Sequence, residues 1–232
     1  MEPLKVDMHS HLLPGIDDGS KNIPQTLEMI RQMIDMGYEK LIMTPHIISD
    51  SYKNTPEIIL EKLDRVKEKV EQQKLNIELE AAAEYYLDEA FIKMLENNDK
   101  LLTFGGNYLL FETAFINRSS QFDHAIFLMQ SLGYQPVFAH PERYIYLYDS
   151  YEEFAKLKER GVMLQVNINS LAGYYSKTAR EVAEKLIDDG LISFLGSDCH
   201  SKRHFPHMEK ARQTPHYNKA LQQKMLNNSL LS

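Results

Sequence analysis

The stretch Val6-Asp7-Met8-His9-Ser10-His11 places two histidines at the end of a short apolar run. Such a run is typical of a buried β-strand. On a strand, side chains two residues apart point to the same face, so the imidazoles of His9 and His11 can bind one metal ion. Taken alone, the pair could equally be two surface histidines that form hydrogen bonds.

The same placement recurs along the chain. Other histidine and acidic residues lie at or just past the end of nearly every apolar run: Asp18, His46, Glu84, Glu112, His140, Asp198 and His200. Strand ends on one rim of a barrel converge in space, so ligands scattered through the sequence can form one polynuclear metal site. Together with His9 and His11, these residues predict a metal centre for hydrolytic chemistry.

Each of these residues also has a plainer interpretation by itself. Glu84 and Glu112 could be strand-end carboxylates turned to solvent, and Asp17-Asp18-Gly19 is ordinary turn chemistry. A carboxylate can, however, bridge two cations about 3.5–4 Å apart, the spacing of two-metal hydrolases. Repetition after successive strands favours the metal centre. His124 and His216 lack this placement, and we expect both at the surface.

Alternating strands and helices predict an α/β fold. Apolar runs predict strands at residues 5–8, 40–44, 77–83, 108–111, 136–139, 163–166 and 192–196. Helical patterns lie at residues 24–36, 56–73, 88–96, 121–132, 151–160 and 178–189. A closed barrel and an open doubly wound sheet both fit this alternation. Because ligands after nearly all the strands must reach one site, we favour a TIM-like barrel of seven units. The tail, 208–232, is expected to be helical and to pack outside the barrel.

Composition narrows the class of protein. The 232 residues suit one domain, 1–232, with 43% hydrophobic and 25% charged residues. A formal charge of −7 argues against a nucleic-acid partner. No apolar run approaches the roughly 20 residues that cross a bilayer, and the N-terminal residues show no signal-peptide pattern. Cys199 is the only cysteine, which excludes an intrachain disulfide. We therefore expect a cytoplasmic protein that is not embedded in a membrane.

Seven motifs occur in order along the chain: Asp7-Met8-His9-Ser10-His11, Gly15-Ile16-Asp17-Asp18-Gly19, Thr44-Pro45-His46, Ala83-Glu84-Tyr85-Tyr86, Phe111-Glu112, Ala139-His140-Pro141-Glu142-Arg143-Tyr144 and Ser197-Asp198-Cys199-His200. With this ordered set the chain resembles the PHP (polymerase and histidinol phosphatase) superfamily. Within it, the chain is most similar to the tyrosine-protein phosphatases of bacterial capsule and exopolysaccharide loci, the CpsB/YwqE type. The resemblance implies a distorted (β/α)7 barrel, the PHP fold, that holds three metal ions, usually Mn²⁺, with Fe, Co or Zn as alternatives.

The resemblance also implies how the ligands are shared. His9, His11, Glu84 and Asp198 would hold one ion; Glu84, as a bridge, would hold the second with Glu112 and His140; and Asp18, His46 and His200 would hold the third. Arg143 and Arg203 match arginines that bind phosphate. The implied activity is hydrolysis of phosphotyrosine by a metal-activated hydroxide. The implied partner is the phosphotyrosine tail of a bacterial tyrosine kinase that governs polysaccharide synthesis.

Three other functions compete with this one. A cysteine-dependent phosphatase needs Cys-x5-Arg, but Phe205 stands at that position after Cys199, so we expect a packed thiol instead. A small-molecule phosphomonoesterase, such as a histidinol-phosphate phosphatase, and a non-catalytic metal-binding module both stay open. Several tyrosines near strand ends could flank a phosphotyrosine ring, although core packing explains most tyrosines. They are Tyr85, Tyr86, Tyr144, Tyr146, Tyr148, Tyr174 and Tyr175.

Overall fold

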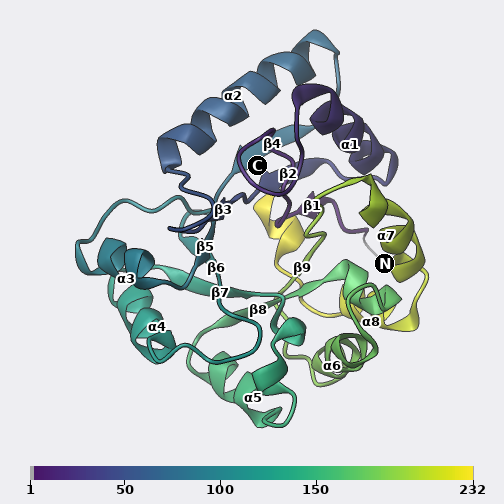
Figure 1. The fold of residues 1–232 in the computed structure, drawn as a ribbon. Helices are drawn as coiled ribbons and strands as arrows, with labels where there is room; N and C mark the ends of the chain where they lie inside the picture. Colours follow the sequence, from purple (N-terminus) through teal and green to yellow (C-terminus); the bar gives the residue numbers. More distant parts are fainter. Residues whose placement is uncertain (1–2, 232) are drawn as a thin grey trace.

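The computed structural model describes residues 3–231, and its strands form a closed parallel ring (Figure 1). The strands are β1 (Val6–Asp7), β2 (Lys40–Met43), β3 (His46–Ile47), β4 (Glu78–Ala81), β5 (Glu84–Tyr86), β6 (Tyr108–Glu112), β7 (Gln135–Ala139), β8 (Met163–Asn167) and β9 (Phe194–Gly196). They pair as β1-β2-β4 and β3-β5-β6-β7-β8-β9, with every pair parallel.

The two sheets are parts of one barrel. Only two residues separate β2 from β3, and two separate β4 from β5, so each pair is one interrupted strand. The ring closes through a parallel bridge between Ser10 and Cys199, beside a hydrogen bond from His11 N to Cys199 O (3.0 Å). The strands thus occupy seven positions, and the prediction of a seven-unit barrel is confirmed. The interruption was not foreseen: His46 and Glu84 begin short strands of their own instead of following one.

Helices cover the outside of the ring (Figure 1). They are α1 (Ile23–Asp35), α2 (Pro56–Gln72), α3 (Glu89–Glu96), α4 (Phe122–Ser131), α5 (Glu152–Glu159), α6 (Lys177–Asp188), α7 (Phe205–Arg212) and α8 (Pro215–Gln222). The first six lie within one residue of the predicted bounds. Side chains of Asn22, Thr55, Asp88 and Ser176 accept hydrogen bonds from the first turns of α1, α2, α3 and α6, which satisfies backbone donors there.

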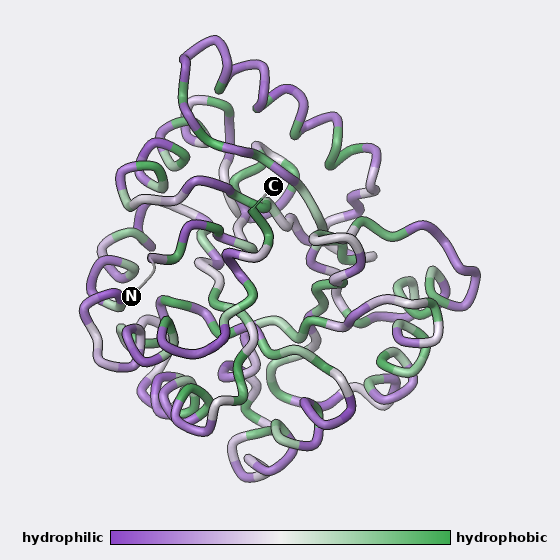
Figure 2. Tube along the Cα trace, turned by 180° about the vertical axis from the view of Figure 1, so that it is seen from behind, coloured by the Kyte–Doolittle hydropathy of each residue, from purple (hydrophilic) through white to green (hydrophobic). Residues whose placement is uncertain are grey.

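Apolar side chains form two layers. One layer lies between the strands and the helices, where α2 buries Ile59, Leu63, Val66 and Val70 on one face. The other fills the inside of the ring: Val6, Met8, Ile42, Ala82, Phe104, Leu110, Val137, Ala139, Phe194 and Leu230. Figure 2 shows the hydrophobic colouring along the inner strands and alternating colours along the helices. The barrel is therefore packed below the rim on which the ligands lie.

The tail differs in part from the prediction. Helices α7 and α8 lie outside the ring, but a final 3-10 turn, η5 (Asn227–Leu230), covers the opposite end of the barrel from the ligands. The Asn227 amide bonds the backbone of Leu195 (3.0 and 2.7 Å) and Val6 (3.0 Å). Leu230 joins the inner apolar layer. The expectation that the tail lies wholly outside was wrong, because exposed strand ends need hydrogen-bond partners. Ser232 lies outside the described residues.

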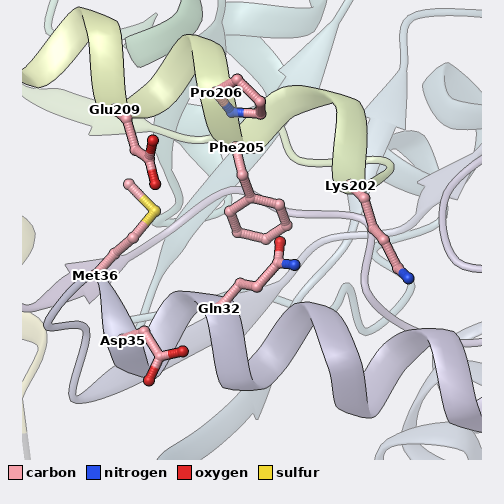
Figure 3. A pocket seen from close by; sticks show the side chains of 7 residues that line it. All are labelled: Gln32, Asp35, Met36, Lys202, Phe205, Pro206 and Glu209. Carbon is pink, nitrogen blue, oxygen red and sulfur yellow. The ribbon is translucent and has the colours of Figure 1, made fainter.

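Helix α7 packs against α1 beside the ring. In Figure 3 the Phe205 ring of α7 points toward Gln32 of α1, with Met36 alongside. The guanidinium of Arg212 donates to Met36 O (2.6 Å) and ties the end of α7 to the end of α1. Within residues 3–231, no helix has both the length and the apolar character needed to cross a membrane.

Candidate metal centre

The nine candidate ligands come together at the C-terminal rim of the barrel. His46 and Glu84 are neighbours in register across β3 and β5, and Glu112 ends β6. His140 follows β7 and Asp198 follows β9, and both have left-handed backbone conformations (φ 36° and 48°). Such conformations are rare for residues other than glycine and cluster at functional sites. Within the described residues, three groupings of these side chains can hold a cation.

The first grouping contains His9, His11 and Glu84, and Asp198 lies beside it. His9 Nε2 lies 3.2 Å from His11 Nε2, 3.3 Å from Glu84 Oε2 and 3.6 Å from Asp198 Oδ1. His11 Nε2 lies 3.4 Å from both of these oxygens. A cation about 2.0–2.2 Å from each of four tetrahedral ligands separates them by roughly 3.3–3.6 Å. The spacing of the His9, His11 and Glu84 atoms therefore fits one metal ion, and Asp198 Oδ1 lies near both histidines.

Glu84 also takes part in a second grouping through its other oxygen. Glu84 Oε1 lies 3.0 Å from His140 Nε2, which is 3.6 Å from Glu112 Oε2. His46 Nδ1 lies 3.1 Å from Glu112 Oε1 and also 3.1 Å from Glu84 Oε2, the oxygen that faces His9 and His11. The third grouping forms around Asp18 Oδ1, which is 3.6 Å from His46 Nε2 and 3.4 Å from His200 Nε2. His46 thus faces two groupings, which the sequence did not predict.

Three hydrogen bonds to Nδ1 atoms orient the histidines. His9 Nδ1 lies 2.7 Å from Gln165 Oε1, His11 Nδ1 lies 2.8 Å from Asp17 Oδ2, and His200 Nδ1 lies 2.9 Å from Asp198 O. Each acceptor holds a proton on Nδ1 and so directs the Nε2 lone pair inward. Sequence reasoning missed Gln165, although a glutamine inside an apolar strand was a usable signal. It treated Asp17 only as part of a turn.

Charge at the rim is tightly balanced. Burial would lower the pKa of His46, but the charge of Glu84 and the polar contacts with Glu84 and Glu112 together raise it to about 10. Burial would likewise raise the pKa of Glu84, yet the charges of His9 and His46 hold it well below its usual value. His46 Nδ1 and Glu84 Oε2 are buried and form no hydrogen bond within residues 3–231. The two atoms face each other at 3.1 Å without a hydrogen bond, an arrangement that fits ligands of a shared cation.

A hollow of about 490 Å³ opens over the ligands. Arg143, at the end of the 3-10 helix η1 (Pro141–Arg143), lines it and lies 3.1 Å from Asp198 Oδ2. Its guanidinium stacks between the rings of Phe115 (4.4 Å) and Tyr175 (4.3 Å). The neighbouring acid Glu142 turns away and accepts from Ser170 Oγ (2.6 Å) and Asn167 N (3.0 Å). Arg143 therefore presents a fixed planar cation at the ligands.

Arg203 occupies a different position. It is exposed on the 3-10 helix η4 (Lys202–His204), and among residues 3–231 the lining of the hollow does not include it. Its role in phosphate binding stays a prediction. The neighbouring His204 does line the hollow, and burial lowers its pKa to about 4. The sequence offered no signal for His204, because it precedes a helix instead of following a strand.

The tyrosines divide between the core and the hollow. Tyr85 and Tyr144 are fully buried core residues. Tyr86, Tyr174 and Tyr175 line the hollow. Tyr146 and Tyr148 are half-buried beside the apolar core.

Tyr52 and Cys199 lie near the ligands, whereas His124 and His216 lie elsewhere. Tyr52, which was not predicted, stacks on His46 with ring centroids 5.6 Å apart and also lines the hollow. Cys199 is a packed thiol, as expected, and burial raises its pKa, which disfavours a nucleophilic thiolate. His124 is exposed and His216 is partly exposed, so both lie at the surface as predicted.

The sequence profile of the capsular polysaccharide synthesis family CpsB/CapC matches residues 5–230. The chain belongs to this family. This CpsB/CapC chain is 30% identical over 206 residues to CapC of Staphylococcus aureus, covering 88% of this chain and 80% of CapC. It is 29% identical over 202 residues to the tyrosine-protein phosphatase YwqE of Bacillus subtilis (strain 168), covering 84% and 77% of the two chains.

The fold agrees with that membership. The structure superposes with a TM-score of 0.85 on a chain from a study of YwqE from Bacillus subtilis and CpsB from Streptococcus pneumoniae, described as metal-dependent tyrosine phosphatases. The two chains are 25% identical, and the match covers 97% of this chain and 94% of the other. The CpsB/CapC chain therefore shares both the sequence pattern and the distorted barrel of those phosphatases.

Proposed function

We propose that this chain is a metal-dependent protein-tyrosine phosphatase that removes phosphate from a bacterial tyrosine kinase and so regulates capsular or extracellular polysaccharide synthesis. The observation that carries the proposal is the position of Glu84. Its two oxygens face two separate groupings of ligand atoms, at 3.3 Å from His9 and 3.0 Å from His140. Family membership and the metal dependence named for the structural relatives support the same conclusion.

The nine rim residues are the proposed ligands, and Arg143 and Arg203 are the proposed phosphate-binding groups. Divalent cations held there would supply an activated water and positive charge for a phosphoryl oxygen. Arg143 would bind a phosphate oxygen through its planar fork, while the stacked rings of Phe115 and Tyr175 keep it in place. Gln165 and Asp17 would keep the tautomers of His9 and His11 suited to metal binding.

Mn²⁺ is the proposed metal, and three ions are proposed from the three groupings. Histidine and carboxylate ligands also accept Fe, Co and Zn, and metal supply often decides which is bound. We further propose that a single domain, 1–232, carries the activity, and that it works in the cytoplasm. A lone cysteine suits that reducing compartment.

The walls of the hollow support an aromatic phosphoester as substrate. Tyr52, Tyr86, Phe115 and Tyr174 line it, and aromatic rings pack well against a phosphotyrosine ring. The phosphotyrosine tail of a kinase is therefore the substrate that we propose.

The test is hydrolysis by the purified chain of p-nitrophenyl phosphate, a phosphotyrosine peptide and histidinol phosphate, with Mn²⁺ and with a chelator. We expect hydrolysis of the first two that the chelator abolishes and that thiol alkylation leaves intact. Preference for histidinol phosphate over the peptide would instead support a small-molecule phosphomonoesterase. Metal binding without hydrolysis of any ester would support a non-catalytic module and overturn the proposal.

A further inference from the structure

A basic groove lies on the outer side of the loop that carries Asp18. It has a volume of about 480 Å³ between this loop and α2. Lys21 from the loop and Lys62, Arg65 and Lys69 from α2 line it, together with Glu68. Four cations and one carboxylate leave three positive charges in a chain whose net charge is −7. We name these four cationic residues the basic groove.

The basic groove follows from the sequence of α2. Lys62, Arg65 and Lys69 are three and four residues apart, so they lie along one face of the helix. The apolar residues of α2, such as Leu63 and Val66, face the barrel instead. Arg65 is exposed, and Lys62 and Lys69 on either side of it are half-buried. All three cations therefore lie beside the loop.

The charges of the basic groove are not neutralised within the chain. Among residues 3–231, Lys21, Lys62 and Arg65 form no ion pair, and Lys69 donates only to the neutral Gln72 (2.9 Å). Elsewhere, surface lysines do pair along their helices, as Lys185 does with Asp189 (2.8 Å). Unpaired cations that converge on one groove are available to an external anion.

The basic groove is structurally connected to the metal centre. Asp18 lines the hollow over the ligands, while Gly15 and Lys21, on either side of it in the same loop, line the groove. The Asn54 amide donates to Ile16 O (2.9 Å) in this loop and to His46 O (2.8 Å) at the ligands. Along α2, Pro56 and Lys62 are about 9 Å apart, a distance that roughly three residues of extended chain would span.

We propose that the basic groove binds acidic residues that flank the phosphotyrosine of a protein substrate, and so selects among phosphoproteins. This inference rests on the proposed function. A substrate chain whose phosphotyrosine enters the hollow can cross the Gly15–Lys21 side of the loop and lay carboxylates along Lys62, Arg65 and Lys69. The partner is an acidic polypeptide segment, because only a chain of several residues reaches from the hollow to the groove.

The experiment compares two phosphotyrosine peptides that differ only in flanking residues, with glutamates in one and glutamines in the other. We expect the wild-type chain to have a roughly tenfold higher kcat/KM for the acidic peptide, mainly through KM, and the preference to shrink with added salt. The variant K62Q/R65Q/K69Q should lose the preference. The control K93Q/K100Q/K177Q removes the same charge from exposed lysines outside α2 and should keep the preference.

Hydrolysis of p-nitrophenyl phosphate, which has no flanks, reports on the proposed function alone and should be equal in all three proteins. No such hydrolysis by the wild-type chain would refute the proposed function, and the docking with it. Normal hydrolysis without a preference for the acidic peptide would overturn the docking alone. A preference that survives K62Q/R65Q/K69Q, or one that is lost in the control, would also overturn the docking. If the triple variant does not fold, R65Q at an exposed position provides the same comparison.

Discussion

Asp17 Oδ2 lies 2.8 Å from His11 Nδ1, so an acidic residue that is not a proposed ligand fixes the ring of one that is. Its other oxygen accepts from Gly19 N (2.9 Å), which anchors the carboxylate to its own turn. Asp18, between Asp17 and Gly19, is itself a proposed ligand. One short turn thus supplies both a ligand and the support for another.

Replacing Asp17 with Asn should weaken metal binding about 10–100-fold with little loss of stability. The amide retains an oxygen for Gly19 N, but its NH₂ group faces His11 Nδ1 and favours the tautomer that places the proton on Nε2. Titration with Mn²⁺ by calorimetry measures the change. The control Asp64→Asn, at an exposed position on α2, should leave the affinity intact. Equal affinities of the Asp17 variant and the wild type would remove Asp17 from the support of the site.

Glu84→Gln should abolish binding of at least one ion and lower phosphatase activity by at least about a hundredfold. The neutral amide is nearly the same size, but it cannot offer negative charge to two groupings at once. Metal content measured on the purified protein, alongside turnover of p-nitrophenyl phosphate, tests both statements. Full metal content with normal turnover would show that Glu84 is not a shared ligand.

Arg143→Lys should lower kcat/KM roughly 10–100-fold and leave the metal content unchanged. Lysine keeps the charge but loses the planar fork, and with it the stacking between Phe115 and Tyr175. Competition by inorganic phosphate should weaken in parallel. Unchanged turnover and phosphate inhibition would take Arg143 out of phosphate binding.

Arg203→Ala tests the second arginine, which is exposed and lies away from the lining of the hollow. If Arg203 reaches the phosphate when substrate is bound, turnover should fall while metal content stays constant. Steady-state kinetics with a phosphotyrosine peptide measure this. Wild-type kcat and KM would leave Arg143 as the only arginine of the pair with a role.

Much of the fold was predictable from the sequence because buried parallel strands and amphipathic helices have distinct periods. Met163-Leu164-Gln165-Val166 predicts a strand, and α2 shows its apolar face in Ile59, Leu63 and Val66. The cap at Asn227 was not predictable, because its amide bonds β1 and β9, which are distant in the sequence. Such a contact has no local pattern.

The sequence predicted which residues are the candidate ligands but not all the contacts that these side chains make. Regular strand ends marked the nine residues, whereas the second contact of His46 depends on where its ring points. Tyr52 reaches the hollow from a bend between a strand and a helix, where no periodicity operates. Side-chain direction in such segments is set by packing between elements, which a single sequence does not display.

Glu142 gives the chain a pH-dependent stability that can be measured without substrate. Burial raises its pKa to about 7, against hydrogen bonds from Ser170 and Asn167 that lower it. Because the folded state binds this proton more tightly than the unfolded state, the stability from Glu142 is complete below its ordinary pKa of 4.5 and is lost as pH rises to about 7. Glu142→Gln stays neutral throughout. We therefore expect the free energy of unfolding of the wild type, relative to this variant, to fall by up to about 3 kcal/mol between those pH values and then stay level. Urea unfolding at a series of pH values, with chelator in every sample, measures the difference; a difference independent of pH would mean that Glu142 is ionised in the fold.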